Sequence, residues 1–169
     1  DLMNPELLPD LKGFLNTYDI PAEYLHLEVT ESSYEENQGK IVCAIERLRE
    51  NGFIVEMDDF GSAYSSLNML KDAPVDILKL DMKFFSGGTH MDKGRKIIQS
   101  VVRLSHSLGI PVIAEGVETE LDSEILRSAN CHMVQGYLYG KPMTVEAFEE
   151  LLADNPIGKK QLLKIGRAH

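Results

Sequence analysis

Carboxylates, one lysine and one glutamine recur at a common kind of position along this sequence. Each of five short apolar segments ends in polar residues, which are, in chain order, Glu28, Asp58 with Asp59, Lys79 with Asp81, Glu115, and Gln135. Taken singly, each is best explained as a turn, cap or ion-pair residue. Taken together they point to a site, because unpaired carboxylates beside an apolar interior need cations or protons to balance their charge.

Three or four carboxylates and one lysine are the side chains of a divalent-metal hydrolase. Carboxylate oxygens suit Mg²⁺ or Mn²⁺ better than zinc. Asp58 and Asp59 are adjacent and can direct one oxygen to each of two ions, and two ions about 3.5–4 Å apart stabilise the attacking and leaving oxygens of a phosphodiester. Lys79 can complement the phosphate charge or hold the attacking water. We therefore expect Mg²⁺ or Mn²⁺ as cofactor, with two ions bound.

The segments that carry these residues read as strands, and helical patterns separate them. The expected strands are YLHLEVT (24–30), FIVEMD (53–58), VDILKLD (75–81), PVIAE (111–115) and HMVQGY (132–137). Helices are expected to begin at caps provided by Asn4, Asp92, Thr119 and Thr144. Alternating strands and helices predict an α/β fold, a partial TIM-like (β/α) barrel of about five βα units with parallel strands. Reacting groups project from the C-terminal ends of such strands, so we expect the polar residues to cluster there.

The composition is that of an ordinary globular protein without a polyanion-binding surface. Its 169 residues are 43% hydrophobic and carry a formal net charge of −10, which argues against binding to a nucleic acid polymer. No apolar run approaches bilayer length and the N-terminus has no secretory pattern. We expect a cytoplasmic location without direct membrane contact, which is compatible with a parent protein tethered through other domains. Cys43 and Cys131 are isolated, which argues against zinc, and Cys43 is expected to be a buried apolar residue.

Five motifs make the interpretation specific. They occur in the order LEVTES (27–32), DDFGSAYSSL (58–67), PVDILKLD (74–81), AEGVET (114–119) and QGYLYGKP (135–142). Together they resemble the EAL domain, which hydrolyses cyclic di-GMP to the linear dinucleotide. The resemblance runs from the first helix to about residue 152, so residues 1–154 are interpreted as a partial EAL-family domain and 155–169 as a C-terminal tail. It implies a modified TIM barrel whose first strand runs antiparallel to the rest.

The resemblance also assigns roles to the residues of these motifs. Glu28 and Asp58 resemble metal ligands, and Asp59 resembles the ligand that recruits the second ion. Lys79 resembles the lysine that faces the attacking water and the phosphate. A two-metal phosphodiesterase mechanism follows from these assignments.

Four further residues are assigned in the same way. Glu115 resembles the carboxylate beside the metals, which is either a ligand or the general base, and Gln135 resembles the residue that positions metal-bound water. Glu31 resembles the glutamate that steadies the loop after the aspartate pair. Glu118 resembles the second glutamate of its motif, which supports the site and its loops.

The sequence departs from the family pattern in three respects. It begins after the family's first three strands, so the namesake Glu-Ala-Leu glutamate and an asparagine ligand are missing. Ala63 stands where the family often has glycine, and Met82 where arginine is common. Glu56 shares strand parity with Asp58, and we expect it to pair with a neighbouring basic group.

The missing strands lead to three further expectations. Hydrolysis by the chain alone should be impaired, the open sheet edges should favour a homodimer or a strand-exchanged assembly, and sensory or cyclase domains should precede this segment in the parent protein. The alternative to an enzyme is a degenerate EAL domain that senses cyclic di-GMP or binds a protein partner. Degenerate members lose carboxylates or the lysine, and this sequence retains those of its motifs.

Overall fold

The computed structural model describes residues 2–61, 67–83 and 91–154 of the chain. The chain forms two compact units, residues 1–138 and residues 139–169, and each is described by itself. Ala63 and the tail 155–169 lie outside the described residues, so the expectations stated for them stay predictions. Among the described helices, none is long and apolar enough to cross a membrane.

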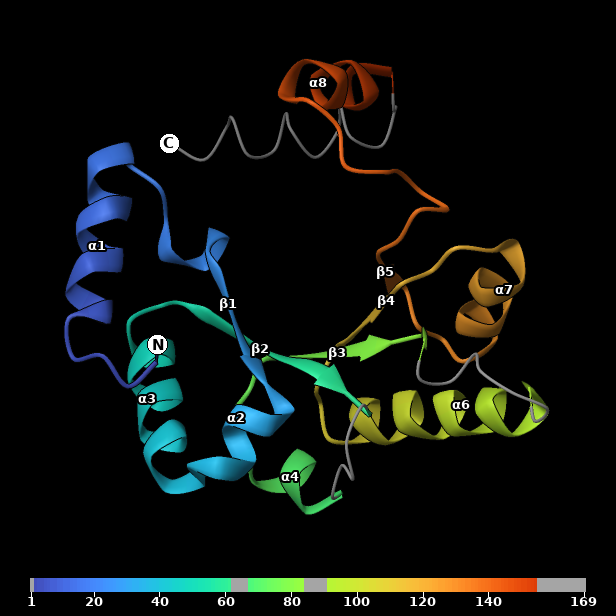
Figure 1. The fold of residues 1–169 in the computed structure, drawn as a ribbon, viewed down its shortest axis with the longest axis horizontal. Coiled ribbons are helices and arrows are strands. Elements are labelled where there is room, and N and C mark those ends of the chain that lie inside the picture. The colour runs from blue at the N-terminus through green and yellow to red at the C-terminus, as the bar shows by residue number, and fades with distance from the viewer. Residues whose placement is uncertain (1, 62–66, 84–90, 155–169) are drawn as a thin grey trace. The chain divides into compact units, whose positions relative to one another are not determined.

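The first unit is built on one parallel sheet of five strands in the order β1-β2-β3-β4-β5 (Figure 1). The strands are β1 (His26–Thr30), β2 (Ile54–Phe60), β3 (Ile77–Asp81), β4 (Val112–Glu115) and β5 (Met133–Val134). Every pair of neighbours is parallel. The predicted α/β fold with five parallel strands is therefore confirmed, and the sequential strand order is that of consecutive units of a (β/α) barrel.

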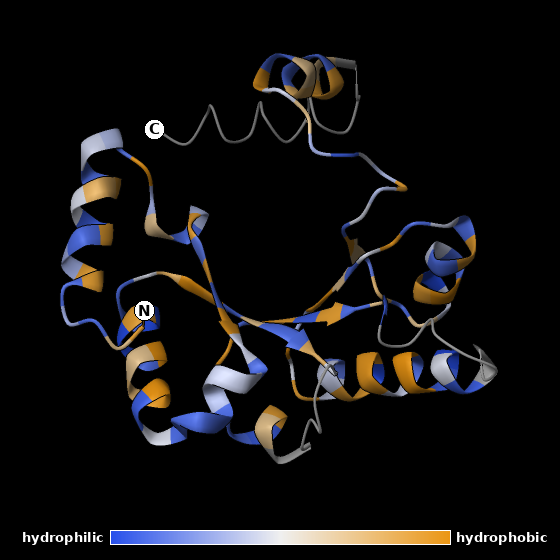
Figure 2. Cartoon of the chain, viewed as in Figure 1, coloured by the Kyte–Doolittle hydropathy of each residue, from blue (hydrophilic) through white to orange (hydrophobic). Residues whose placement is uncertain are grey.

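Helices connect the strands and cover one face of the sheet. In the first unit they are α1 (Leu7–Tyr18), the 3₁₀ turn η1 (Ala22–Tyr24), α2 (Glu31–Glu36), α3 (Gln38–Glu50), α4 (Leu67–Asp72), α6 (Met91–Ser107) and α7 (Glu120–Ser128). The second unit contains α8 (Val145–Asp154). In Figure 1, α3, α4 and α6 lie below the sheet, on the same side. Figure 2 shows apolar residues along the strands and on α3 and α6.

The two faces of the sheet differ in polarity because successive side chains of a strand point to opposite sides. Alternate positions of the central strands supply the buried core residues Val55, Met57, Leu78, Leu80, Val112 and Ala114. The intervening positions hold Glu56, Asp58 and Lys79, which therefore point away from this core. The apolar face of the sheet packs against the helices, and the opposite face carries the polar side chains of the candidate site.

Two of the predicted helix caps are confirmed. The Thr119 side chain accepts a hydrogen bond from the backbone N–H of Asp122 at 3.2 Å, and the Asp122 carboxylate accepts one from the N–H of Thr119 in return, which completes a capping box at the start of α7. Thr144 accepts a hydrogen bond from the N–H of Ala147 at 3.3 Å, just before α8 begins.

The other two caps were predicted at the wrong residues. The Asn4 side chain accepts a hydrogen bond from the N–H of Glu6, and this turn delays α1 until Leu7. The long helix α6 begins at Met91, so Asp92 lies inside its first turn. A local turn competes with helix initiation where Asn and Pro are adjacent, and this moved the start of α1.

Cys43 is exposed on α3, which contradicts the expectation that it is buried. Ile41, Ile45 and Leu48 form the buried face of this helix. Their spacing of four and three residues keeps them on one side, and position 43 falls on roughly the opposite side of a helix with 3.6 residues per turn. Cys131, by contrast, is buried.

Two local features differ from the sequence prediction because tertiary contacts set them. The strand expected at 132–137 contains only Met133–Val134, since the chain turns at Gly136 to pack on the backbone of Val117. The short helix α2 was not expected, because only one of its buried residues, Tyr34, is apolar. Thr30 at the end of β1 caps it.

Candidate active site

The ammonium of Lys79 lies at the meeting point of three carboxylates. It forms ion pairs with Glu28 from β1, with Asp58 Oδ1 from β2 at 3.1 Å, and with Glu115 Oε1 from β4 at 2.9 Å. Lys79 itself comes from β3, so all four neighbouring strands β1–β4 contribute one side chain. The structure thus brings together four of the residues that the sequence placed at strand ends.

Strand register explains why these four side chains meet. Thr30 is the partner of Asp58 across β1 and β2, and Ile113 is the partner of Lys79 across β3 and β4. Glu28 and Glu115 therefore lie two positions from these partners, on the same face of their strands, within reach of a long lysine side chain. The cluster follows from side-chain parity together with parallel register.

Lys79 carries its charge in a largely desolvated position. Its side chain is 8% exposed, whereas those of Asp58 and Glu115 are 20% and 21% exposed and that of Glu28 is 52% exposed. Burial by itself lowers the pKa of Lys79, but hydrogen bonds to Glu28, Glu115 and Asp58 outweigh burial and raise the pKa above its ordinary value. The side chain is therefore a fixed cation at neutral pH.

Glu115 has an environment that favours its protonated form. Burial raises the pKa of its carboxyl group, Lys79 opposes this rise, and the nearby charges of Asp58 and Glu28 add to it. A carboxylate whose pKa is moved toward neutrality is suited to accept a proton at working pH.

Asp59 is placed differently from its neighbour Asp58. It is exposed and has a positive φ of 58°, at a register shift between Met57 and Phe60 in β2. In the part of the chain that the structure describes, Asp59 makes no ion pair with Lys79. The shift turns the backbone between the two aspartates, so they face different surroundings.

Glu31 is buried next to Gly61, the residue that directly follows β2. One of its carboxylate oxygens, Oε2, accepts a hydrogen bond from the backbone N–H of Gly61 at 3.2 Å. The other, Oε1, has no hydrogen-bond partner among the described residues, although the side chain is only 1% exposed. This geometry is suited to holding the chain directly after the aspartate pair.

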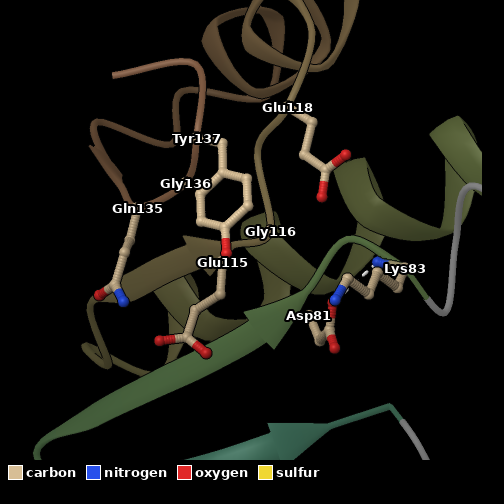
Figure 3. Close-up of a pocket in the computed structure, with 8 residues that line it drawn as sticks. All are labelled: Asp81, Lys83, Glu115, Gly116, Glu118, Gln135, Gly136 and Tyr137. Carbon is tan, nitrogen blue, oxygen red and sulfur yellow. Dashed lines mark hydrogen bonds between the residues drawn. The ribbon is translucent and has the colours of Figure 1, made fainter. Parts of the chain in front are cut away.

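A pocket of about 250 Å³ adjoins the lysine cluster at the C-terminal ends of β3 and β4. Its polar and aromatic lining consists of Asp81, Lys83, Glu115, Glu118, Gln135 and Tyr137 (Figure 3). In Figure 3 the side chains of Glu115 and Gln135 extend in the same direction from the ends of neighbouring strands. Gln135 and Glu118 therefore join the site through this pocket.

Sequence reasoning gave no role to two of the pocket residues, Lys83 and Tyr137. Lys83 follows Asp81 by two positions, and its backbone N–H donates a hydrogen bond to the Asp81 carboxylate at 2.8 Å. An aspartate at a strand end followed two residues later by a cation is a weak pattern, since either residue can equally be a surface residue. The structure is needed to show that both line one pocket.

A further carboxylate on this face is already paired, as expected. Glu56 is buried, and its Oε1 lies 2.5 Å from Nδ1 of His26 on the neighbouring strand. The expectation that Glu56 pairs with a basic neighbour is confirmed.

The carboxylates around Lys79 are suitable ligands for a hard divalent ion. They supply oxygen ligands from three strands, and they already surround one cation at hydrogen-bond distance. Among the described residues, no three His, Cys, Asp or Glu side chains are arranged to hold a metal ion by themselves. A metal ion at this place therefore requires some of the carboxylates to turn from the ammonium to the ion.

Comparison with known proteins identifies the family of the chain. The EAL domain family matches residues 1–142. The chain is 36% identical over 152 residues to the cyclic di-GMP phosphodiesterase NbdA of Pseudomonas aeruginosa, covering 90% of this chain and 19% of NbdA. The chain thus spans about a fifth of the length of such curated relatives.

Solved structures show the same architecture. The cyclic di-GMP complex of the MucR phosphodiesterase from Pseudomonas aeruginosa superposes with a TM-score of 0.79 at 33% identity, covering 87% of this chain and 60% of that one. The manganese and cyclic di-GMP complex of Klebsiella pneumoniae BlrP1 superposes with a TM-score of 0.74 at 30% identity, covering 82% and 35%. The fold and the site define an α/β protein of the barrel type with its polar residues at the strand ends. The chain belongs to the EAL domain family.

Proposed function

We propose that this chain contributes the larger part of a metal-dependent phosphodiesterase site that hydrolyses cyclic di-GMP to the linear dinucleotide. The observation that carries the proposal is the convergence of Glu28, Asp58 and Glu115 on Lys79 at the C-terminal end of the sheet, in a chain of the EAL family. NbdA is named a cyclic di-GMP phosphodiesterase, and MucR was solved with that dinucleotide.

The proposed cofactor is Mg²⁺ or Mn²⁺, with two ions bound. Structures of BlrP1 contain manganese or calcium together with the dinucleotide, which supports a divalent ion. Glu28 and Asp58 would hold the first ion and Asp59 would recruit the second. When bound, such ions supply Lewis-acid stabilisation and lower the pKa of water.

The remaining roles belong to the protein's own groups. Lys79 keeps its proton, so it acts as a fixed positive donor toward the phosphate and the attacking water rather than as a base. Glu115 is either a metal ligand or the general base, and its raised pKa favours the base. Gln135 would orient water, and Glu31 and Glu118 would hold the loops around the site.

The proposed partners follow from the sheet and from the relatives. In the described sheet β1 and β5 are the end strands, so their outer edges are available for pairing in a homodimer or a strand-exchanged assembly. The relatives are several times longer than this chain, and MucR is named a bifunctional cyclase and phosphodiesterase, which supports sensory or cyclase domains in the parent protein. The cytoplasmic location stays a prediction, as does the assignment of residues 1–154 to one EAL-family domain.

A second candidate function has one observation in its favour. The ammonium of Lys79 occupies the centre of the carboxylate cluster. Among the described side chains, no three His, Cys, Asp or Glu residues are arranged to bind a metal ion. A domain that binds cyclic di-GMP without hydrolysing it, or that binds a protein partner, would not need a preformed metal site. The presence of the lysine and of the carboxylates that belong to this chain's own motifs favours the enzyme.

Product analysis separates these candidates. The chain, and in parallel the longer parent protein, are incubated with cyclic di-GMP in Mg²⁺ or Mn²⁺, and the linear dinucleotide is measured by chromatography. We expect rapid turnover by the parent, slow turnover by the chain, and none after chelation or in Lys79→Ala. Binding without any product in both proteins would identify the sensor. Neither binding nor product would refute both the enzyme and the cyclic di-GMP sensor, and would leave the protein-binding domain.

A further inference from the structure

The pocket beside the lysine cluster has an unfavourable charge for an anionic ligand. Asp81, Glu115 and Glu118 line it, and of the described lining residues only Lys83 is basic. Lys79 does not line this pocket, and its ammonium, on a side chain that is 8% exposed, contacts three carboxylates. Beyond the proposed metal ions, a basic side chain at this pocket would offset the repulsion between its three carboxylates and the phosphates of a dinucleotide.

Lys83 is held at this pocket by two local contacts. Its backbone N–H donates to Oδ1 of Asp81, which fixes the turn after β3. Its side chain runs along Gly116 at the end of β4, where Cγ and Cε lie 3.8 Å and 3.9 Å from the place that a Cβ on Gly116 would occupy. Gly116 has a positive φ of 69° and leaves this path open. The stem of Lys83 therefore lies across the end of β4, next to Glu115.

The position of Lys83 is also set by the residue before it. Met82 is 2% exposed and packs into the core, so the chain turns the next side chain outward. Lys83 is exposed and is labelled at the edge of the pocket in Figure 3, with its backbone bonded to Asp81. An exposed ammonium on a flexible stem reaches an anion as a point charge.

We propose that Lys83 binds a phosphate oxygen of the dinucleotide and so determines affinity for the anionic substrate. The inference rests on the proposed function, since the ligand is the substrate of that site. Lys83 acts as a binding residue that places one phosphate at the mouth of the pocket, while Lys79 and the metal ligands serve the phosphate that reacts. Because the contact is exposed, salt weakens it.

Equilibrium binding of cyclic di-GMP tests this role without relying on turnover. Titration calorimetry is carried out with the chain in Ca²⁺, the ion of one BlrP1 complex, at low and at high salt. We expect the dissociation constant of Lys83→Ala to rise about tenfold and that of Lys83→Glu to rise more, since a hydrogen bond to a charged group is lost. Lys83→Arg should stay within about threefold of the unmodified chain. The unmodified chain should also show the steeper salt dependence.

Two further variants make the result specific. Lys12→Ala removes the same charge from α1, which in Figure 1 lies at the opposite end of the sheet from β4 and β5, and it should bind normally. Lys83→Gln keeps a hydrogen-bond donor but loses the charge, so it should bind as weakly as Lys83→Ala. Normal binding by Lys83→Gln would show that the contact is with a neutral base, and the proposal would be wrong.

The outcomes also separate this inference from the proposed function. If the unmodified chain binds cyclic di-GMP and Lys83→Ala binds it equally well, the assignment of Lys83 is overturned and the function stands. If the chain and its parent neither bind nor hydrolyse the dinucleotide, the function itself is overturned, and this inference with it.

Discussion

Glu28 and Glu56 occupy partner positions in the register of β1 and β2, and each is held by a different side chain. Glu28 pairs with Lys79 from β3, and Glu56 pairs with His26, two residues before Glu28 on β1. Like charges directly opposite each other repel. Separate partners therefore keep Glu56 within the buried layer of the sheet and leave Glu28 directed toward the site.

Replacing His26 tests this arrangement. In His26→Ala the carboxylate of Glu56, which is 6% exposed, loses its partner while it remains buried. We expect the free energy of unfolding to fall by about 1–2 kcal/mol, a value reduced by the partial exposure of the histidine. Denaturant unfolding measures the change. The double variant His26→Ala with Glu56→Ala should recover most of the loss, and equal stability of the single variant and the unmodified chain would contradict the pairing.

Lys79 should be as important for stability as for chemistry. Lys79→Met leaves three carboxylates without their shared cation, and we expect the free energy of unfolding to fall by about 3 kcal/mol. Because the pKa of Lys79 is raised, the stabilisation by its charge is complete below the ordinary value of 10.5 and is lost only as the pH rises through the raised value. The deficit should therefore be constant between neutral and mildly alkaline pH.

Metal ions should restore part of this stability. With the ammonium removed, millimolar Mn²⁺ can bind the carboxylate cluster, and binding to the folded state raises the unfolding temperature. We expect a larger rise for Lys79→Met than for the unmodified chain, measured by thermal unfolding with and without Mn²⁺. Lys12→Met is the matched control. No response to Mn²⁺ in the variant would show that the three carboxylates do not form a cation site.

The opposite end of the sheet should affect stability alone. Asp76 lies just before β3, where Oδ1 accepts from Nε of Arg49 and Oδ2 accepts from the backbone N–H of Val55, both at 2.9 Å. Asp76→Ala removes both bonds, and we expect a loss of about 2 kcal/mol in unfolding free energy. Affinity for cyclic di-GMP, measured well below the unfolding temperature, should not change. A weaker affinity would mean that the two ends of the sheet are coupled.

Gly136 should tolerate no side chain. A Cβ at this position would lie 2.2–2.7 Å from backbone atoms of Val117, which cannot move without breaking the link between β4 and β5. Gly136→Ala should therefore destabilise the chain by about 2–4 kcal/mol and impair the site through Gln135. Gly13 in α1 has open space around it, so Gly13→Ala should add roughly 0.5–1 kcal/mol. Comparison of the two variants by denaturant unfolding tests both statements.

The sequence predicted those parts of the fold that local periodicity determines. Short apolar segments that end in polar residues marked β2 and β3, and the shared strand-end position of Asp58 and Lys79 predicted that they cluster. The short length of β5 was not predictable, because it depends on the packing of Gly136 against Val117. Element type follows from local pattern, whereas boundaries depend on contacts made by distant residues.

The sequence predicted which residues form the site better than it predicted the contacts between them. Strand-end position identified Glu28, Asp58, Lys79 and Glu115, but only the register of four strands shows that the lysine is their common partner. The register shift that separates Asp59 from Asp58 leaves no mark in the sequence, since adjacent aspartates read alike. Only the structure shows that Asp58 and Asp59 face different surroundings, because the local backbone conformation decides where each side chain points.

Asp59 combines an unusual backbone conformation with a proposed metal role, and three variants separate the two. Its φ of 58° lies in the left-handed region, which asparagine and glycine adopt readily and β-branched residues do not. Asp59→Val should lower the free energy of unfolding by about 1–2 kcal/mol, whereas Asp59→Asn and Asp59→Gly should be as stable as the unmodified chain. All three lack the carboxylate, so all three should bind one Mn²⁺ ion fewer, or bind the second ion more weakly, in a calorimetric titration. If Asp59→Asn keeps the full affinity and stoichiometry, Asp59 is not a metal ligand. If Asp59→Val is as stable as Asp59→Asn, the positive φ is not required by the fold.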